Sequence, residues 1–476
     1  MLNILGVEDY GIYNVVGGIV AMFGFLNGAM TTSTQRYLTF ELGKGNFQRL
    51  RQVFSTSVNI HFLIAVLICI MAETVGLWFM YEKMVIPTER FAAAMWVYQL
   101  SILTTVIAIL SYPYNAIIVA HERMSVFAFI SVMEIILKLA VVYLLKIWDF
   151  DKLILYAILI AAVQLFIRFV YSGYCSKHFA ESKYQWYIDK PLFKEMLSFA
   201  GWNLWGSLAS VLSTQGLNMI LNVFFGPIVN AARAVAVQVQ GAIQMFSANF
   251  QMALNPQITK TFAKNELDEM HKLIFRGCRF SFYLLYVISL PVILETPVIL
   301  ELWLKTVPDY SVQFLRIMLL ISLVDATANP LMTSAAASGN VRRYQTVVGG
   351  VILMILPLTY VAFRLGAPPH AAFVVHFCVC CTAFIVRLFL IRPLIRLSIR
   401  AYIKNVVFKC CGVSFLSAVV PACMHYLMKP TIVASVTIMF VSVLSAIMVC
   451  YFVGLENNER MLINAKLSQL ISKIRN

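Results

Sequence analysis

Runs of about 20 apolar residues recur along this chain, and they constrain its fold more than any other feature. A helix of about 20 apolar residues crosses a bilayer core of about 30 Å. Hydrophobic residues make up 61% of the 476 positions and charged residues 12%, far from the average of soluble proteins. Period-2 alternation, the mark of a membrane β-barrel, is absent. The sequence therefore predicts an all-α integral membrane protein with thirteen spans, at 13–32, 56–79, 91–116, 125–146, 152–174, 198–224, 231–254, 277–303, 311–337, 344–363, 371–391, 405–427 and 432–454.

The formal net charge of +15 reflects membrane topology rather than nucleic-acid binding, because the cations concentrate on alternate loops. The loops at 35–55, 121–124, 175–197, 254–279, 338–343 and 387–409, with the tail after 454, hold 26 Lys or Arg, and the opposite loops hold seven. The positive-inside rule makes the crowded side cytoplasmic, which places the C-terminus inside. We interpret Arg387, Arg392, Arg396 and Arg400 as topology signals that contact lipid phosphates.

A shift of 220 residues superposes the first half of the chain on the second. It carries Gly6 onto Gly226 and Phe54 onto Ile274, and each predicted span from 56 to 174 falls on another. Six helices per repeat is an even number, so we expect two six-helix lobes related by a pseudo-two-fold axis along the membrane normal. Two further helices follow the repeat.

We expect an N-lobe at 1–174, a basic cytoplasmic linker at 175–197, a C-lobe at 198–394, a helix pair at 405–454 and an amphipathic cytoplasmic tail at 455–476. The counterpart of Gly6 is preceded by the helix 198–224, whereas Gly6 follows only a few residues. The repeat therefore predicts that a first helix is truncated here and that the full count is fourteen.

Polar residues line one face of several otherwise apolar helices. In hydrocarbon such groups need partners or water, so they favour a wet cavity or contacts between helices. Helix 198–224 has one such stripe, and the next helix has a second. The last three residues of the second stripe have counterparts 220 positions earlier, so the first lobe has a stripe of its own. The candidate path residues are Asn203, Ser207, Ser210, Thr214 and Asn218, then Gln240, Gln244, Ser247, Gln251 and Asn255, then Asn27, Thr31 and Gln35. We expect the stripes of the two lobes to face each other across a central cavity.

Ionisable residues in the middle of a span are candidates for function because inserting them costs about 2.5–3.5 kcal/mol each. Glu134 and Lys138 stand four residues apart on one helix and can pair. Asp325 reads as a lone carboxylate and as a candidate for proton or cation coupling, a role also open to Glu134. Arg168, Arg233 and Arg316 lie nearer helix ends, where long side chains snorkel to the interface.

Neither cysteine nor histidine shows the spacing of a metal site, so we expect no metal and treat the ten cysteines as small apolar residues. No extramembrane loop exceeds roughly two dozen residues, too few for a catalytic domain of ordinary size. The sequence therefore predicts a protein that is not an enzyme.

The stretch LGVEDYGIYNVVGGIVAMFGFLNGAMTTSTQRYLTFELGKGN resembles the start of bacterial polysaccharide-export flippases of the multidrug/oligosaccharidyl-lipid/polysaccharide exporter superfamily. PYNAIIVAHERM at 113–124 and its echo PLMTSAAASGNVRR at 330–343 add a weaker likeness. The resemblance implies two lobes around a central cavity and transfer of undecaprenyl-pyrophosphate-linked oligosaccharide, such as an O-antigen, capsule or exopolysaccharide unit, from the cytoplasmic to the periplasmic leaflet.

For that function the pyrophosphate needs cations, and Lys138, Arg168 and Arg36 are the best candidates, while the polar stripes would meet sugar hydroxyls. We expect a monomer in the bacterial inner membrane, with no cofactor beyond coupling to H⁺ or Na⁺. Its partners would be membrane lipids and the polymerase and glycosyltransferases of lipopolysaccharide or other polysaccharide synthesis. Two hypotheses stay open: a cation-coupled multidrug antiporter of the same superfamily, and a non-transporting enzyme or structural partner in envelope assembly.

Overall fold

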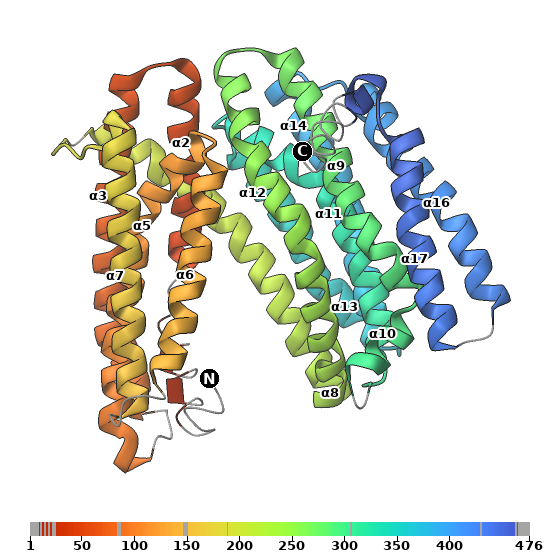
Figure 1. Ribbon diagram of the computed structural model, residues 1–476, viewed down its shortest axis with the longest axis horizontal. Helices are drawn as coiled ribbons and strands as arrows, with labels where there is room; N and C mark the ends of the chain where they lie inside the picture. Colours follow the sequence, from red (N-terminus) through yellow and green to blue (C-terminus); the bar gives the residue numbers. More distant parts are fainter. Residues whose placement is uncertain are drawn as a thin grey trace, which may run out of the picture. The chain divides into compact units, whose positions relative to one another are not determined.

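The computed structural model describes residues 9, 12, 13, 16, 17, 20, 25–82, 87–145, 151–187, 189–304, 307–428, 431–461 and 464. Every regular element in these ranges is helical, which confirms the predicted fold class (Figure 1). The chain divides into two compact units, Met1–Leu204 and Trp205–Asn476, called unit 1 and unit 2 below. Each unit is described by itself.

Unit 1 is a bundle of long helices (Figure 1). A π-helical turn at Ala72–Gly76 joins α3 to α4, and α8 begins in this unit and continues into unit 2. The helices are α2 (Phe25–Lys44), α3 (Phe47–Met71), α4 (Leu77–Glu82), α5 (Phe91–Ala120), α6 (Met124–Leu144), α7 (Lys152–His178) and the start of α8 (Lys190–Ala263).

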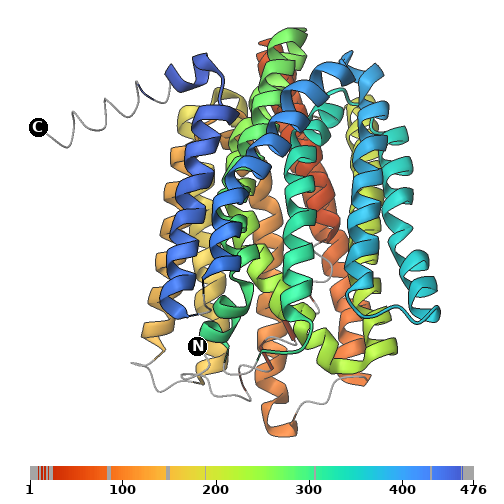
Figure 2. The ribbon, with the colours of Figure 1, turned by 90° about the vertical axis from the view of Figure 1, so that its right-hand side faces the viewer.

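Unit 2 holds the rest of α8 and the helices up to the C-terminal segment. Figure 2 shows α16 and α17 side by side as an antiparallel pair. The helices are α9 (Leu267–Leu294), α10 (Thr296–Trp303), α11 (Ser311–Ala337), α12 (Arg342–Leu353), α13 (Ile355–Arg364), α14 (Ala371–Ile395), α15 (Ile399–Tyr402), α16 (Phe408–Leu427) and α17 (Ile432–Val449).

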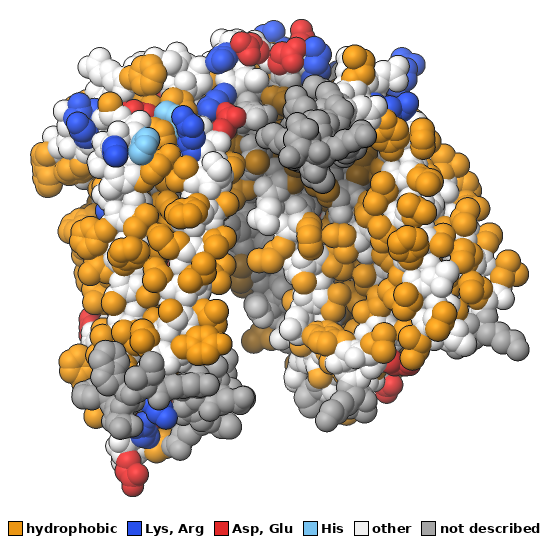
Figure 3. Space-filling view, in the orientation of Figure 1, with side chains coloured by type: hydrophobic (Ala, Val, Ile, Leu, Met, Phe, Trp, Pro, Cys, Tyr) orange, Lys and Arg blue, Asp and Glu red, His pale blue; other side chains and the backbone are white. Residues whose placement is uncertain are grey.

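Eleven helical segments in the described part of the chain are long and apolar enough to span a membrane. They correspond to eleven of the thirteen predicted spans. The other two are 13–32 and 231–254, each of which carries a polar stripe; the first lies partly outside the described residues, and the second lies inside α8. In Figure 3 orange side chains form an apolar belt on the visible face of each unit, as expected for surfaces in contact with lipid.

The expected cytoplasmic loops are much shorter than the sequence predicted. α2 runs to Lys44 and α3 begins at Phe47, so most of 35–55 is helical, and 175–197, 254–279 and 387–409 are likewise entered by helices from both sides. Apolar runs mark only the part of a helix that lies in hydrocarbon. The amphipathic ends continue because their backbone groups stay paired outside the membrane as well.

The repeat of 220 residues is visible in the bounds of the helices. α3 begins at Phe47 and α9 at Leu267, and α5 and α11 begin at Phe91 and Ser311, so both pairs are 220 positions apart. The turns that precede α3 and α9 also match, because Gly45 and Asn265 have φ angles of 71° and 60°. These left-handed positions favour Gly and Asn.

Gly226 divides α8 into two helices. Its φ of 78° and ψ of −173° are non-helical, and Lys190–Ala263 consists of two helices that meet at a kink at this residue. The sequence predicted two helices separated by a glycine here, and the structure confirms them, with the break confined to Gly226. A glycine is required because an L side chain rarely adopts this φ. Gly6, its predicted counterpart, lies outside the described residues.

Candidate functional site

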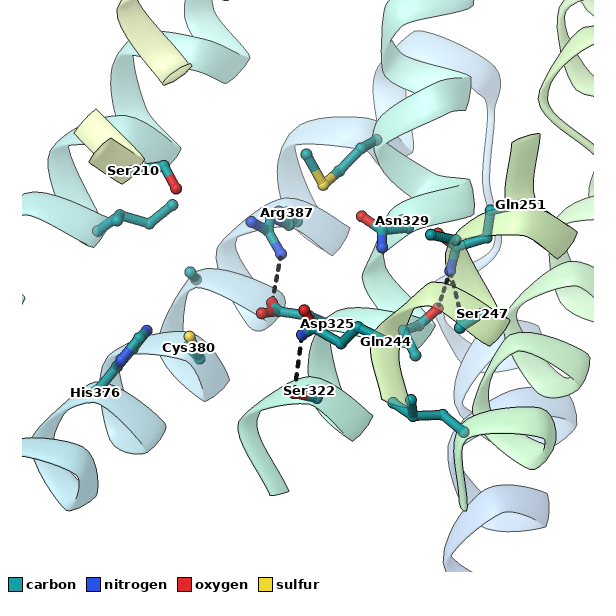
Figure 4. A pocket seen from close by; sticks show the side chains of 16 residues that line it. Ser210, Gln244, Ser247, Gln251, Ser322, Asp325, Asn329, His376, Cys380 and Arg387 are labelled. Carbon is teal, nitrogen blue, oxygen red and sulfur yellow. Dashed lines mark hydrogen bonds and ion pairs between the residues drawn. The ribbon is translucent and has the colours of Figure 1, made fainter. Parts of the chain in front are cut away.

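A polar cavity of about 300 Å³ lies within unit 2. Three helices supply its polar walls, and Figure 4 shows their side chains converging on it. They are Ser210, Gln244, Ser247 and Gln251 from α8, Ser322, Asp325 and Asn329 from α11, and His376, Cys380 and Arg387 from α14.

Helical spacing explains why each helix presents several groups to the cavity. Gln244, Ser247 and Gln251 follow each other at steps of three and four, which places them on one face of α8. On α11 the spacing of the three polar lining residues is the same. Both sets could be recognised in the sequence, and the structure brings them together.

Glutamine side chains connect α8 to α11. The Nε2 of Gln244 donates to Ser322 Oγ at 2.9 Å, and the Nε2 of Gln240 donates to the same oxygen at 2.7 Å. The Nε2 of Gln251 donates to Ser247 Oγ at 3.1 Å. Gln240 does not line the cavity, so its contacts hold the helices together, whereas Gln244 and Gln251 contribute both to packing and to the cavity wall.

Asp325 is not the lone carboxylate that the sequence suggested. Arg387 Nη1 lies 3.9 Å from its Oδ1, and the side chains of Asp325 and Arg387 are 40% and 8% exposed (Figure 4). The interpretation of Arg387 as a lipid-facing topology signal was therefore wrong. Its guanidinium lies inside unit 2, where it compensates the charge of the carboxylate and makes the cavity polar without making it acidic.

The missed residues of α14 had a signal in the sequence. His376, Cys380, Ala383 and Arg387 line the cavity at steps of four, three and four, the spacing of the recognised stripes. Arg387 is also followed by further apolar residues. A cation with apolar neighbours on both sides along the chain lies deeper in the membrane span than a cation at the edge of a charged run.

Of the stripe predicted on the first part of α8, Ser210 lines this cavity, and Asn203, Ser207, Thr214 and Asn218 do not. Asn203 Nδ2 donates to Phe199 O at 3.0 Å, and Thr214 Oγ1 donates to Ser210 O at 2.9 Å. Ser207 is exposed. These helix-internal bonds satisfy the polar groups locally.

Arg233 does not simply snorkel. Its Nη1 donates to Asn218 Oδ1 at 3.1 Å, and its Nη2 donates to Thr214 O at 3.0 Å. These bonds link the two parts of α8 on either side of Gly226. Arg233 therefore holds together the two helices that meet at Gly226.

In unit 1 the predicted ion pair is present. Lys138 Nζ lies 2.6 Å from Glu134 Oε1, and Gln164 Nε2 donates to the same oxygen at 2.9 Å. Arg168, one turn further along α7 than Gln164, has its guanidinium carbon 4.1 Å from the centre of the Tyr114 ring. Arg168 therefore lies against an aromatic face inside the bundle, where a cation–π contact stabilises it.

Arg36 is buried on α2 among aromatic rings. Its guanidinium carbon lies 4.4 Å from the ring centre of Tyr37, 4.8 Å from that of Phe40 and 5.6 Å from that of Phe199. On the same helix Thr31 and Gln35 are partly buried. Asn27, the third residue of their stripe, lies outside the described side chains.

The sequence also predicts that the stripes of the two lobes face each other. This concerns both units and stays a prediction. Asn255 Oδ1 accepts from Thr333 Oγ1 at 2.8 Å, which ties the end of α8 to α11. Among the described residues, no group of three or more His, Cys, Asp or Glu side chains is placed to hold a metal ion.

Comparison with protein families decides the affiliation of the chain. Residues 1–262 match the family described as "Polysaccharide biosynthesis protein". The chain belongs to this family. A comparison with curated proteins gives no match.

Solved structures with a similar fold include proteins described as transporters. A point mutant of a MATE protein superposes with a TM-score of 0.72 at 12% identity, over 82% of this chain and 89% of that one. The bent form of the MATE transporter VcmN from Vibrio cholerae gives a TM-score of 0.68 at 14% identity, over 85% and 96%. A MOP superfamily transporter from Pyrococcus furiosus gives 0.67 at 12% identity, over 84% and 94%. The fold is thus that of the MOP superfamily.

Proposed function

We propose that this protein moves an undecaprenyl-pyrophosphate-linked oligosaccharide from the cytoplasmic to the periplasmic leaflet of a bacterial inner membrane by alternating access. The observation that supports this most is the charge-compensated cavity of unit 2, in a member of a polysaccharide biosynthesis family. The glycan would be an O-antigen, capsule or exopolysaccharide repeat unit.

The chemistry of the cavity suits a sugar. Glutamine amides and serine hydroxyls both donate and accept hydrogen bonds, as sugar hydroxyls do. Gln244, Gln251 and Ser210 supply such groups to the cavity. A neutral, hydroxyl-rich ligand gains from many such partners without needing a net charge opposite to its own.

The pyrophosphate requires cations, and unit 1 supplies the candidates. Arg168 lies against Tyr114, and Arg36 lies among aromatic rings. Lys138 is paired with Glu134, but its side chain is 42% exposed, so it can also reach a ligand. The polyprenyl chain can remain in the hydrocarbon of the bilayer.

A cation-coupled multidrug antiporter is the second candidate within the same fold. An organic cation would favour a cavity with an uncompensated acid, and both acids proposed for ion coupling have a basic partner. Arg387 accompanies Asp325, and Lys138 accompanies Glu134. The pairing favours the glycan over the cation, and it leaves Asp325 and Glu134 as the proposed sites for coupling to H⁺ or Na⁺.

The experiment is leaflet transfer of a defined lipid-linked oligosaccharide in proteoliposomes. Lys138→Gln keeps a polar side chain and removes its charge, so transfer should slow by about tenfold if the cation contacts pyrophosphate. Lys152→Gln, at the exposed start of α7, is the matched control and should transfer at the rate of the unmodified protein. Unchanged transfer by the Lys138 variant would remove that residue from the path.

A further inference from the structure

The segment between α7 and α8 lies along one face of α3. Three α3 side chains spaced by four residues hold its backbone: Arg51 Nε donates to Lys183 O at 3.2 Å, Ser55 Oγ accepts from Gln185 N at 3.1 Å, and Asn59 Nδ2 donates to Tyr187 O at 3.2 Å. Non-helical backbone near a membrane needs such partners. The segment 183–187 therefore forms a wall along the helix.

An apolar groove of about 670 Å³ opens on one side of this wall. Phe62 and Leu63 of α3 and Trp186 of the wall line it, and their exposed fractions are 56%, 52% and 83%. Val58, Leu110 and Phe193 add to its apolar lining, and Asp189 and Lys190 are also among its lining residues. The exposed face of α3 continues beyond the groove with more large apolar residues, so the groove opens toward the hydrocarbon of the bilayer.

A polar basin of about 910 Å³ lies at the start of α3 and shares Tyr187 with the groove. Gln48 and Arg51, in the first turns of α3, line it, where the positive end of the helix dipole favours anions. Among the described lining residues Glu181 is the carboxylate, and it is paired with His121 at 2.6 Å. The charge of Arg51 therefore has no carboxylate against it among the described lining residues.

The two hollows follow each other along α3. Ser55 lines the basin and Thr56 lines the groove. Figure 3 shows Lys, Arg and His side chains gathered at one end of unit 1, above its apolar belt. The positive-inside rule predicts a cytoplasmic position for the α3 start. A molecule with an anionic head group and a long hydrocarbon chain matches this order of surfaces.

We propose that this surface of α3 is a docking site for the lipid-linked glycan, with the isoprenoid chain in the groove and the pyrophosphate and first sugar in the basin. The inference rests on the proposed function, since it names a second site for the same substrate. The basin favours a sugar head group over that of a phospholipid, because the amides of Gln48 and Gln52 offer donors and acceptors that hydroxyls can use.

Photo-crosslinking tests the groove. The probe is a benzophenone-bearing polyprenyl-pyrophosphate disaccharide, added to the full chain in proteoliposomes. Leu63→Trp fills the groove and should reduce labelling of α3 about tenfold. Leu67→Trp places the same ring one turn further along α3, at a position that is 47% exposed and outside the groove, and should leave labelling unchanged. Equal labelling of both variants would overturn the groove.

Two opposite charges at one position test the basin. Gln48→Glu adds a negative charge beside the predicted pyrophosphate and should weaken probe binding by at least about fivefold, the effect expected for two charges about 4 Å apart in water. Gln48→Lys should strengthen binding by a similar factor. A change of the same sign in both variants would contradict an anionic head group in the basin.

The outcomes separate this site from the proposed function. Glycan transfer with no loss of labelling in Leu63→Trp would refute the docking site and leave the function standing. Specific labelling without transfer by the unmodified protein would refute the function and leave the site standing. A photoreactive phosphatidylglycerol that labels the groove equally, and competes with the glycan probe, would show a bulk phospholipid as the occupant and overturn the proposal.

Discussion

Separating Asp325 from Arg387 tests the central feature of the unit 2 cavity. With Oδ1 and Nη1 3.9 Å apart, two unit charges attract by about 4 kcal/mol at an effective dielectric constant of 20, and by about 1 kcal/mol in water. The Asp325 side chain is 40% exposed and the Arg387 side chain only 8%, so solvent screens one partner far more than the other. We expect a coupling of about 1–4 kcal/mol.

A double-mutant cycle measures this coupling. Asp325→Asn, Arg387→Met and the double variant are unfolded in mixed micelles, and tryptophan fluorescence gives the free energy of unfolding. Asp325→Asn should destabilise the protein most as a single change, because it leaves the buried guanidinium of Arg387 without its carboxylate, whereas Arg387→Met leaves a carboxylate that solvent still reaches. The double variant should recover at least about 1 kcal/mol of the summed losses. Strictly additive losses would show that the two side chains do not compensate each other.

Two other predictions concern the ends of the units. Glu459→Gln should destabilise unit 2 by about 3 kcal/mol, because Arg279 and Glu459 form a buried ion pair in which each side chain is 2% exposed. The loss lies at the lower end of the range for such pairs because Glu456 still contacts the same guanidinium. Denaturation in micelles measures it, and a loss below about 1 kcal/mol would contradict this prediction. The backbone N–H of Leu192, in the first turn of α8, and then Arg49 hold the pKa of Asp189 below its ordinary value. A lowered pKa stabilises the fold above about pH 4 and loses that effect as pH falls further. Protection from hydrogen exchange at the start of α8, measured relative to the intrinsic rate at each pH, should therefore decrease in acid, and Asp189→Asn should remove this pH dependence while keeping a capping side chain.

The positions of the helices along the chain could be predicted from the sequence because they follow from strong, repeated signals. Apolar runs of membrane length gave the spans, and the shift of 220 gave helix starts that match at Phe47 and Leu267. The true helix ends could not be read in the same way. Outside the hydrocarbon a helix no longer needs apolar residues, so the helices that end at Lys44 and Ala263 run beyond the predicted span ends at 32 and 254.

The candidate site was predictable only where a pattern repeated on one helix. The stripe of Gln244, Ser247 and Gln251 has helical spacing, and the structure places it in the cavity. The partnership of Asp325 and Arg387 joins α11 to α14. Such a contact depends on how helices pack and leaves no signal in either segment alone.

The contacts of the α3 docking surface had a signal that went unrecognised. Arg51, Ser55 and Asn59 are spaced by four on α3, so their side chains share one face. Their partner is an irregular backbone segment more than a hundred residues further along the chain. Spacing shows that three polar groups act together, but not what they bind.

Leaflet transfer of a defined undecaprenyl-pyrophosphate-linked oligosaccharide, measured beside export of an organic cation in the same proteoliposomes, tests the proposed function most directly. We predict that the protein speeds transfer of the lipid-linked glycan well above protein-free liposomes and does not move the cation. Export of the cation, with glycan transfer no faster than in protein-free liposomes, would contradict the proposal.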